Sequence, residues 1–130
     1  MDDTKTVLVV DSDDKSRDLI FASAAKSGQI PIFCSSCDEA RSLLALRRFN
    51  VVFCSDALPD GQYAEVISAA KPTPVIVVSR LAEWGAYVAA LHVGAFDYLA
   101  SPPHAAEIDR ILLSALKEGS QTLREQPSAA

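Results

Sequence analysis

Short, continuous apolar runs recur along this 130-residue chain, and they constrain its fold more than any other feature. An unbroken run such as Thr6–Val10 is typical of a strand that is covered on both faces. The runs predict five strands, at Thr6–Val10, Ile30–Cys34, Val51–Cys54, Val75–Val78 and Phe96–Leu99. Segments with helical spacing of apolar residues separate them. Because crossovers between parallel strands are right-handed, this alternation predicts a parallel sheet with helices on both faces.

The helical segments carry recognisable start and stop signals. Asp13 and Asp14 suit the first turn of a helix that closes at Gly28. Ser36 and Glu39 have the spacing of a capping box. Three further helices are expected at 62–70, at 80–93 and after 103, the last one ending near Gly119. We expect one domain over residues 5–118 and a polar, disordered tail over residues 119–130.

Composition excludes several classes of function. The net charge is -5 and the basic residues are scattered, which argues against nucleic-acid binding. No apolar run approaches the ~20 residues that span a bilayer. The chain begins with acidic residues and has no signal-peptide pattern, so we expect a cytoplasmic protein. Three cysteines do not make a disulfide framework.

Polar residues follow four of the predicted strands. The run Asp11-Ser12-Asp13 follows the first strand and Ser55-Asp56 the third. Ser79 follows the fourth strand and Ser101 the fifth. In a doubly wound sheet these strand ends converge, and ligands bind outside the carboxyl ends of the strands. The sequence therefore predicts a site at this edge.

Four stretches, VLVVDSD, FNVVFCSDALPDG, PVIVVS and GAFDYLASPP, make the chain resemble the receiver domains of two-component response regulators, the family of the chemotaxis receiver protein. The resemblance covers residues 5 to 118. It implies a three-layer α/β/α, flavodoxin-like, doubly wound fold with five parallel strands in the order 2-1-3-4-5. It also implies phosphoryl transfer from a histidine kinase to an aspartate, with magnesium held by carboxylates.

The chain departs from the family pattern at three places in one pocket. The family has an acidic pair after the first strand, where this chain has Asp11 and then Ser12. Counting back from Pro59, or forward through the third strand, places the aspartate acceptor position at Ser55. Ser101 stands where the family has a lysine. The hydroxyl position is kept by Ser79 and the switch aromatic by Tyr98.

These departures predict a receiver fold without phosphorelay chemistry. Phosphoryl transfer needs a nucleophile in line, a metal and a cation on the phosphoryl oxygens. A serine with no base or cation beside it is a weak nucleophile. Asp11 alone, even if aided by Asp13 or Asp56, is a poor magnesium site, so no cofactor is expected. We expect a module that is not an enzyme, binds a protein through its fourth helix, fifth strand and fifth helix, and is a monomer or weak homodimer.

Alternatives to this hypothesis remain open. Asp56 could be the acceptor in an ordinary receiver with Mg²⁺ and a histidine kinase partner, or only a turn residue. Asp11, Asp13 and Asp14 could serve as helix caps as readily as metal ligands. Cys34 and Cys37 form a C-x-x-C pair that could act as a thiol redox sensor. Trp84 and Tyr87 could be core residues or part of the partner surface.

Overall fold

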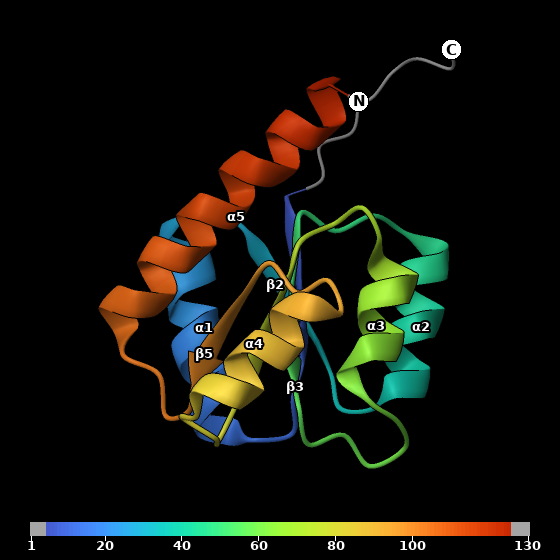
Figure 1. The fold of residues 1–130 in the computed structure, drawn as a ribbon. Coiled ribbons are helices and arrows are strands. Elements are labelled where there is room, and N and C mark those ends of the chain that lie inside the picture. The colour runs from blue at the N-terminus through green and yellow to red at the C-terminus, as the bar shows by residue number, and fades with distance from the viewer. Residues whose placement is uncertain (1–4, 126–130) are drawn as a thin grey trace.

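The computed structural model describes residues 5–125, with side chains as far as Glu118, and shows the expected three layers (Figure 1). All strand pairs are parallel, and the strand order is β2-β1-β3-β4-β5. This confirms the predicted doubly wound topology. The elements are β1 (Thr6–Val10), α1 (Asp14–Lys26), β2 (Ile30–Cys34), α2 (Cys37–Leu46), β3 (Val51–Ser55), α3 (Tyr63–Ala70), β4 (Val75–Ser79), α4 (Trp84–His92), β5 (Asp97–Ala100) and α5 (Ala105–Glu125).

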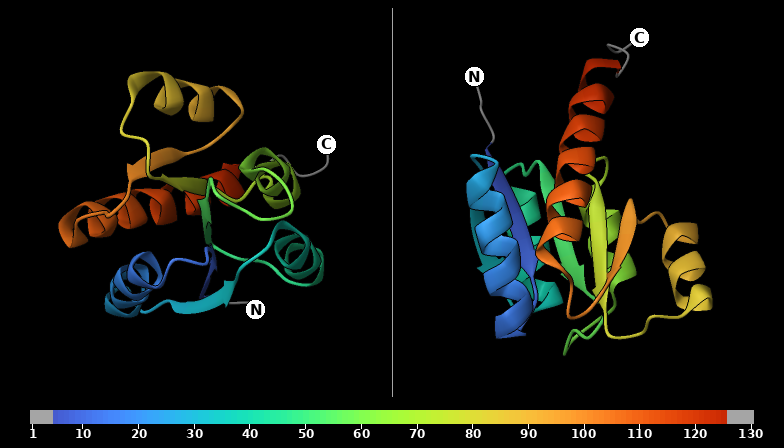
Figure 2. Two further views of the ribbon diagram at one scale, coloured as in Figure 1. Left: turned by 90° about the horizontal axis from the view of Figure 1, so that it is seen from below. Right: turned by 90° about the vertical axis from the view of Figure 1, so that its left-hand side faces the viewer.

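The pleat of the strands divides the core into two halves. Successive side chains of a strand point to opposite faces, so Val9 packs toward α1 and α5 whereas Val10 packs toward α2, α3 and α4. Phe53 and Cys54 of β3 divide in the same way. Figure 2 shows α1 and α5 on one face of the sheet and α2 and α3 on the other. Every residue of β1, β3 and β4 is buried, as their unbroken apolar runs predict.

Helix ends form where the sequence signals place them. The Asp13 side chain caps α1 by accepting a hydrogen bond from the Ser16 backbone N–H. The Ser36 side chain caps α2 through the Glu39 N–H at 3.1 Å. Gly28 (φ 73°) and Gly94 (φ 108°) follow α1 and α4 in the left-handed region that favours glycine.

The fourth helix begins later than predicted. The expected helix spanned residues 80–93, but Arg80 to Glu83 form a loop and α4 starts at Trp84. The Leu81 backbone explains the difference, because its N–H and C=O groups bond to side chains of other elements instead of to helical partners. The predicted apolar face of this helix is also turned outward: Trp84 is 76% exposed and only Ala90 is buried.

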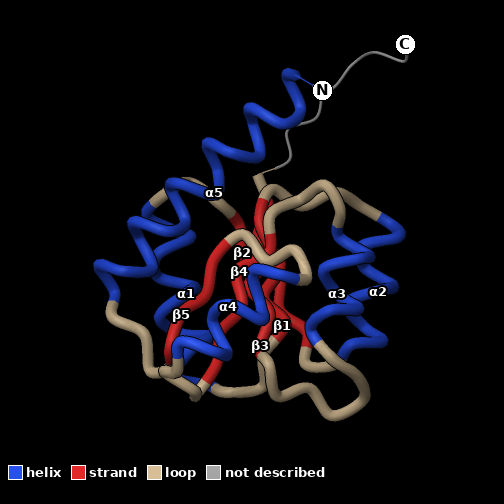
Figure 3. Tube along the Cα trace, viewed as in Figure 1, coloured by secondary structure: helices blue, strands red, loops and turns tan. Residues whose placement is uncertain are grey.

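The fifth helix ends later than predicted. It continues through Gly119 to Glu125, and its last turns project beyond the sheet in Figure 3. Glycine inside a helix costs only about 1 kcal/mol, which flanking helix formers such as Lys117 and Glu118 can offset. The expectation of disorder from residue 119 is therefore wrong for 119–125, and 126–130 lie outside the described residues. Within residues 5–125, no helix is both long and apolar enough to span a membrane.

Asp60, in the loop after β3, bonds to the start of α2. The two carboxylate oxygens of Asp60 accept hydrogen bonds from the N–H groups of Cys37 (2.7 Å) and Asp38 (3.0 Å) at the start of α2. These bonds lower the pKa of the Asp60 carboxyl group. The loop after β3 is thereby attached to the N-terminus of α2.

Adjacent leucines on α5 test the assignment of its buried face. Leu112 is fully buried against the sheet, whereas Leu113 is 58% exposed. We expect Leu112→Ala to lower the free energy of unfolding by roughly 2–5 kcal/mol, because it removes apolar contacts and leaves a cavity. Leu113→Ala, the matched control, should change it by about 0.5 kcal/mol or less. Urea denaturation measures both values, and equal losses would contradict the assignment.

Candidate functional site at the carboxyl edge of the sheet

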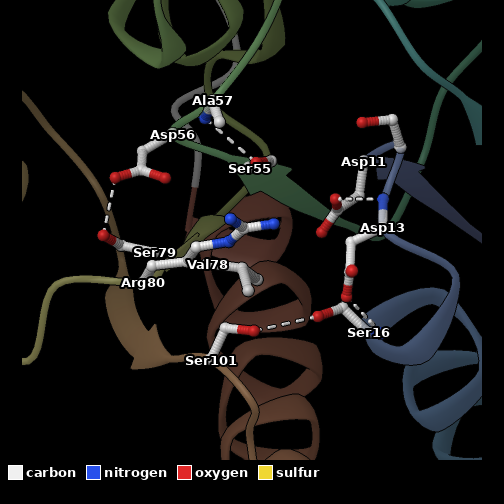
Figure 4. Close-up of a pocket in the computed structure, with 11 residues that line it drawn as sticks. Asp11, Asp13, Ser16, Ser55, Asp56, Ala57, Val78, Ser79, Arg80 and Ser101 are labelled. Atoms are coloured by element: carbon white, nitrogen blue, oxygen red, sulfur yellow. Dashed lines mark hydrogen bonds between the residues drawn. The ribbon is translucent and has the colours of Figure 1, made fainter.

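A small pocket lies where the carboxyl ends of β1, β3, β4 and β5 meet (Figure 4). The sequence predicted these strand ends to converge, and their polar side chains do line one pocket. The lining residues are Asp11, Ser12, Asp13, Ser16, Ser55, Asp56, Ala57, Val78, Ser79, Arg80 and Ser101. Tyr98 is not among them.

The pleat separates the two candidate acceptor residues. Ser55 continues the face of β3 that carries Phe53, toward α1 and α5. Asp56 comes next, and its N–H donates to the Val78 carbonyl at 3.0 Å, so it still follows the sheet register. Its side chain therefore lies toward the opposite face. In Figure 4 the Asp56 carboxylate points away from Asp11 and toward Ser79.

Each of the two residues has its own hydrogen bond. Ser55 is buried, with 7% of its surface exposed, and its Oγ accepts the Ala57 N–H at 3.0 Å. The Asp56 Oδ2 atom accepts the Ser79 hydroxyl at 2.6 Å, a short bond of the charge-assisted kind. The Ser79 Oγ atom in turn accepts the Leu81 N–H at 2.9 Å. Asp56 is thus bonded within the pocket and is not only a solvated turn residue.

The pKa values of the two acids after β1, Asp11 and Asp13, are shifted in opposite directions. Burial is the main cause that raises the pKa of the Asp11 carboxyl group, and the nearby Asp13 charge adds to it. One Asp11 oxygen accepts the Asp13 N–H at 2.9 Å, which opposes the rise. The pKa of Asp13 is lowered, chiefly by the Ser16 N–H bond and in part by the charge of Arg80. The helix-cap interpretation therefore holds for Asp13.

Sequence reasoning missed two polar side chains of this pocket. Ser16 is buried, and its Oγ lies 3.3 Å from the Oγ of Ser101. Its position three residues after the cap Asp13 was the available signal. Arg80 directly follows the strand-end Ser79 but was assigned to a helix. Figure 4 shows its guanidinium group extended across the pocket toward Asp11 and Asp13.

The donor set does not fit a magnesium ion. Magnesium is usually bound through one or two carboxylates together with waters and substrate phosphates. Here Asp56 points to the other face, Asp13 is engaged at the start of α1, and Ser12 offers only an exposed hydroxyl. Within the described part of the chain, no group of three or more His, Cys, Asp or Glu residues could hold a metal. That no cofactor binds at Asp11 stays a prediction.

The C-x-x-C pair and the third cysteine are core residues. Cys34, Cys37 and Cys54 are free and buried in the same half of the core. Burial raises the pKa of Cys34 to about 11 and also raises the pKa values of Cys37 and Cys54. Since the thiolate is the reactive form, these thiols are poorly suited to redox sensing.

Aromatic side chains form a surface next to the pocket. Tyr98 donates its hydroxyl hydrogen to the Leu81 carbonyl at 2.6 Å. Its ring meets Tyr87 edge-on, with 6.0 Å between ring centroids, and Tyr87 lies 5.2 Å from Trp84. We call Trp84, Tyr87 and Tyr98 the aromatic surface. Trp84 and Tyr87 are therefore not core residues in the described structure.

Comparison with known proteins agrees with this fold. No family model matches the chain. It is 32% identical over 134 residues to a protein-glutamate methylesterase/protein-glutamine glutaminase of Rhizobium etli, covering 95% of this chain and 39% of that protein. It is 25% identical over 124 residues to the response regulator protein PilR of Pseudomonas aeruginosa, covering 92% of this chain and 28% of that protein.

A solved structure decides the fold. The receiver domain of the Francisella response regulator 1452 matches with a TM-score of 0.79 and 23% identity, over 88% of this chain and 98% of that one. The chain therefore has the fold of response regulator receiver domains. It spans well under half the length of either curated relative, and the methylesterase and glutaminase names describe that whole relative.

The opposite pKa shifts of Asp11 and Asp13 should appear in the pH dependence of the protein's stability. A carboxyl group whose pKa rises on folding destabilises the folded state at pH values above that pKa, and this cost is absent below about pH 3. Asp11→Asn keeps an oxygen for the Asp13 N–H. We therefore expect this variant to be more stable than the wild type at pH 7 and equally stable at about pH 3.

Asp13→Asn is the control of opposite sign. Because folding lowers the pKa of Asp13, its ionised form stabilises the folded state above the ordinary carboxyl pKa. This variant should be less stable than the wild type at pH 7, and the loss should vanish in acid. Urea denaturation at both pH values measures the differences. A stability loss in Asp11→Asn at pH 7 would contradict the assigned environments.

Proposed function

We propose that this receiver domain acts in phosphorelay-type signal transduction as a protein-interaction module that does not depend on phosphorylation. It is not an enzyme, needs no cofactor and works in the cytoplasm as a monomer or weak homodimer. One observation carries the proposal: Ser55, which the family pattern places at the acceptor position, has a buried hydroxyl whose oxygen already accepts the Ala57 N–H. A serine held in this way has neither a base nor a metal to activate it.

The electrostatics of the pocket support the same proposal. Ser101 lies against Ser16 instead of providing the family's lysine ammonium group. The carboxylate that follows Ser55 in the sequence, Asp56, is bonded to Ser79 on the other face of the sheet. The parts that phosphoryl transfer requires are therefore either replaced or directed elsewhere.

The aromatic surface supports the interaction role. Its Trp84 is 76% exposed, and three apolar residues of the same region, Leu81, Val88 and Leu91, are also exposed. Aromatic residues are enriched where proteins bind one another, and exposed apolar side chains gathered in one region can mark such sites. We infer that a partner protein binds the face made by α4, β5 and α5.

A phosphoryl mimic tests the proposal. Adding magnesium and beryllofluoride should leave the amide NMR signals of the wild-type pocket unchanged, because the acceptor carboxylate and metal ligands are missing. The triple variant Ser12→Asp, Ser55→Asp, Ser101→Lys restores the family residues and should give saturable shifts. Saturable shifts around the wild-type pocket would reject the proposal, whatever the variant does.

Asp56 as phosphoacceptor is the second candidate, favoured by one observation. Its carboxylate lines the pocket and already holds the Ser79 hydroxyl at 2.6 Å. In that case the chain would be an ordinary receiver that uses Mg²⁺ and a histidine kinase. The position of Asp56 on the face opposite Asp11 counts against it, because no carboxylate pair would then hold the metal.

Intact mass distinguishes the two candidates. After treatment with acetyl phosphate, we expect the wild-type mass to remain unchanged, because Asp56 lacks a metal site beside it. A base-labile phosphoryl adduct that disappears in Asp56→Asn but persists in Asp60→Asn would establish Asp56 as the acceptor. Asp60 is a suitable control, since its carboxylate lies in the same loop and bonds to α2 instead.

A further inference from the structure

Four exposed cations lie at the amino-terminal edge of the sheet, the edge opposite the pocket. They come shortly before three strands: Lys5 before β1, Arg47 and Arg48 before β3, and Lys71 before β4. Because β1, β3 and β4 are consecutive in the sheet, the segments that carry these cations are neighbours. The cations are scattered along the sequence, and parallel pairing of the strands brings them to one edge.

Contacts between these segments hold the edge together. The Arg48 carbonyl accepts the hydroxyl of Thr6, the first residue of β1, at 3.2 Å. The Phe49 carbonyl accepts the hydroxyl of Thr73, which lies just before β4, also at 3.2 Å. The Arg47 guanidinium group lies 5.5 Å from the centroid of the buried Phe49 ring. The cations therefore extend from a backbone that the sheet fixes in place.

The charges of this edge are not used in ion pairs. Within the described residues, the cations that form salt bridges are others, namely Arg17, Lys26 and Arg41. A helix C-terminus favours a nearby cation, which accounts for Arg47 and Lys71 at the ends of α2 and α3. It does not account for Lys5, which precedes a strand.

Two strongly exposed aliphatic side chains lie at the same edge. Leu46, the last residue of α2, is 80% exposed and directly precedes Arg47. Ile30, the first residue of β2, is 61% exposed and pairs with Thr6 of β1. Aliphatic groups beside cations can contact a segment that carries both carboxylates and apolar side chains.

We propose that this edge binds an acidic segment of a partner protein that also carries aliphatic side chains. We call the surface the basic edge; its residues are Lys5, Ile30, Leu46, Arg47, Arg48 and Lys71. The proposal adds a second interaction surface, remote from the pocket, to the proposed function and does not depend on it.

The charge distribution of the whole chain favours a short segment over a large anionic surface. The net charge is -5, and the carboxylates of Asp11, Asp13 and Asp56 lie at the opposite edge. A membrane or a nucleic acid would repel the rest of the molecule while it attracts four cations. A short acidic segment contacts the basic edge alone, so it gains the attraction without this repulsion.

Fluorescence anisotropy with a labelled peptide of alternating glutamate and leucine tests the proposal on the full chain. The wild type should bind the peptide, and added salt should weaken binding because it screens exposed charges. The double variant Arg47→Gln, Arg48→Gln should bind about fivefold or more weakly, since one exposed ion pair changes an equilibrium constant by about two- to fivefold.

Leu46→Ser tests the apolar contribution. It should weaken binding of the glutamate–leucine peptide but not of a peptide in which serine replaces leucine, because only the first peptide offers aliphatic groups. Leu46 is 80% exposed, so its replacement should not unfold the chain. Equal losses with the two peptides would contradict the assigned role of Leu46.

The double variant Lys15→Gln, Arg110→Gln is the matched control. Both cations are exposed, and their loss changes the net charge as much as the Arg47 and Arg48 changes do. They lie in the first two turns of α1 and α5, which begin at the carboxyl edge. This control should bind the peptide as the wild type does. Peptide-induced NMR shifts should gather at Leu46 and Arg48.

Five results would overturn the inference. They are no peptide binding at low salt, an equal loss in the matched control, and NMR shifts that gather at the aromatic surface instead. The fourth is self-association that Arg47→Gln, Arg48→Gln abolishes, which would assign the edge to a second copy of the chain. The fifth is displacement of the peptide by phosphatidylserine vesicles or by an RNA oligonucleotide. The beryllofluoride experiment measures the proposed function separately, so the two failures are distinguishable.

Discussion

Burial of β1, β3 and β4 on both faces is the constraint on which the rest of the structure depends. Strands that are apolar on both sides must be covered by helices on both sides, and parallel pairing then brings their carboxyl ends to one edge. Polar residues can therefore follow these strands only at the strand ends, where the helices no longer cover the sheet. Asp11, Ser55 and Ser79 are accordingly buried polar residues at that edge, each with a hydrogen-bond partner.

The pocket that results keeps its carboxylates apart. Its carboxylates do not face one another around a metal position. Asp13 is held by the first turn of α1, Asp56 by Ser79, and Asp11 by the Asp13 N–H. Arg80 extends from β4 across the mouth, as Figure 4 shows, and places a cation beside Asp13. Every side-chain polar atom that is buried in the described residues has a hydrogen-bond partner.

The outward face of α4 is apolar. Its apolar side chains point outward although their spacing is that of a core helix, which leaves Ala90 as the single buried residue of α4. Because Leu81 bonds to both Ser79 and Tyr98, the pocket and this surface share one loop. A partner that binds the surface would therefore lie close to the loop whose Leu81 N–H bonds to the pocket residue Ser79.

The sequence by itself determined the strand runs, the helix caps at Asp13 and Ser36, and the convergence of polar residues at one edge. These features are local: a strand's burial follows from its apolar run, and a cap from residues three positions apart. Counting along the third strand also placed the acceptor position at Ser55 with Asp56 beside it, and the roles of both residues in phosphorylation stay predictions. Tertiary structure alone decided that α4 begins at Trp84, that Arg80 enters the pocket, and that Asp56 bonds to Ser79. Each of these depends on a neighbour from another strand or loop, and no spacing within one segment contains that information.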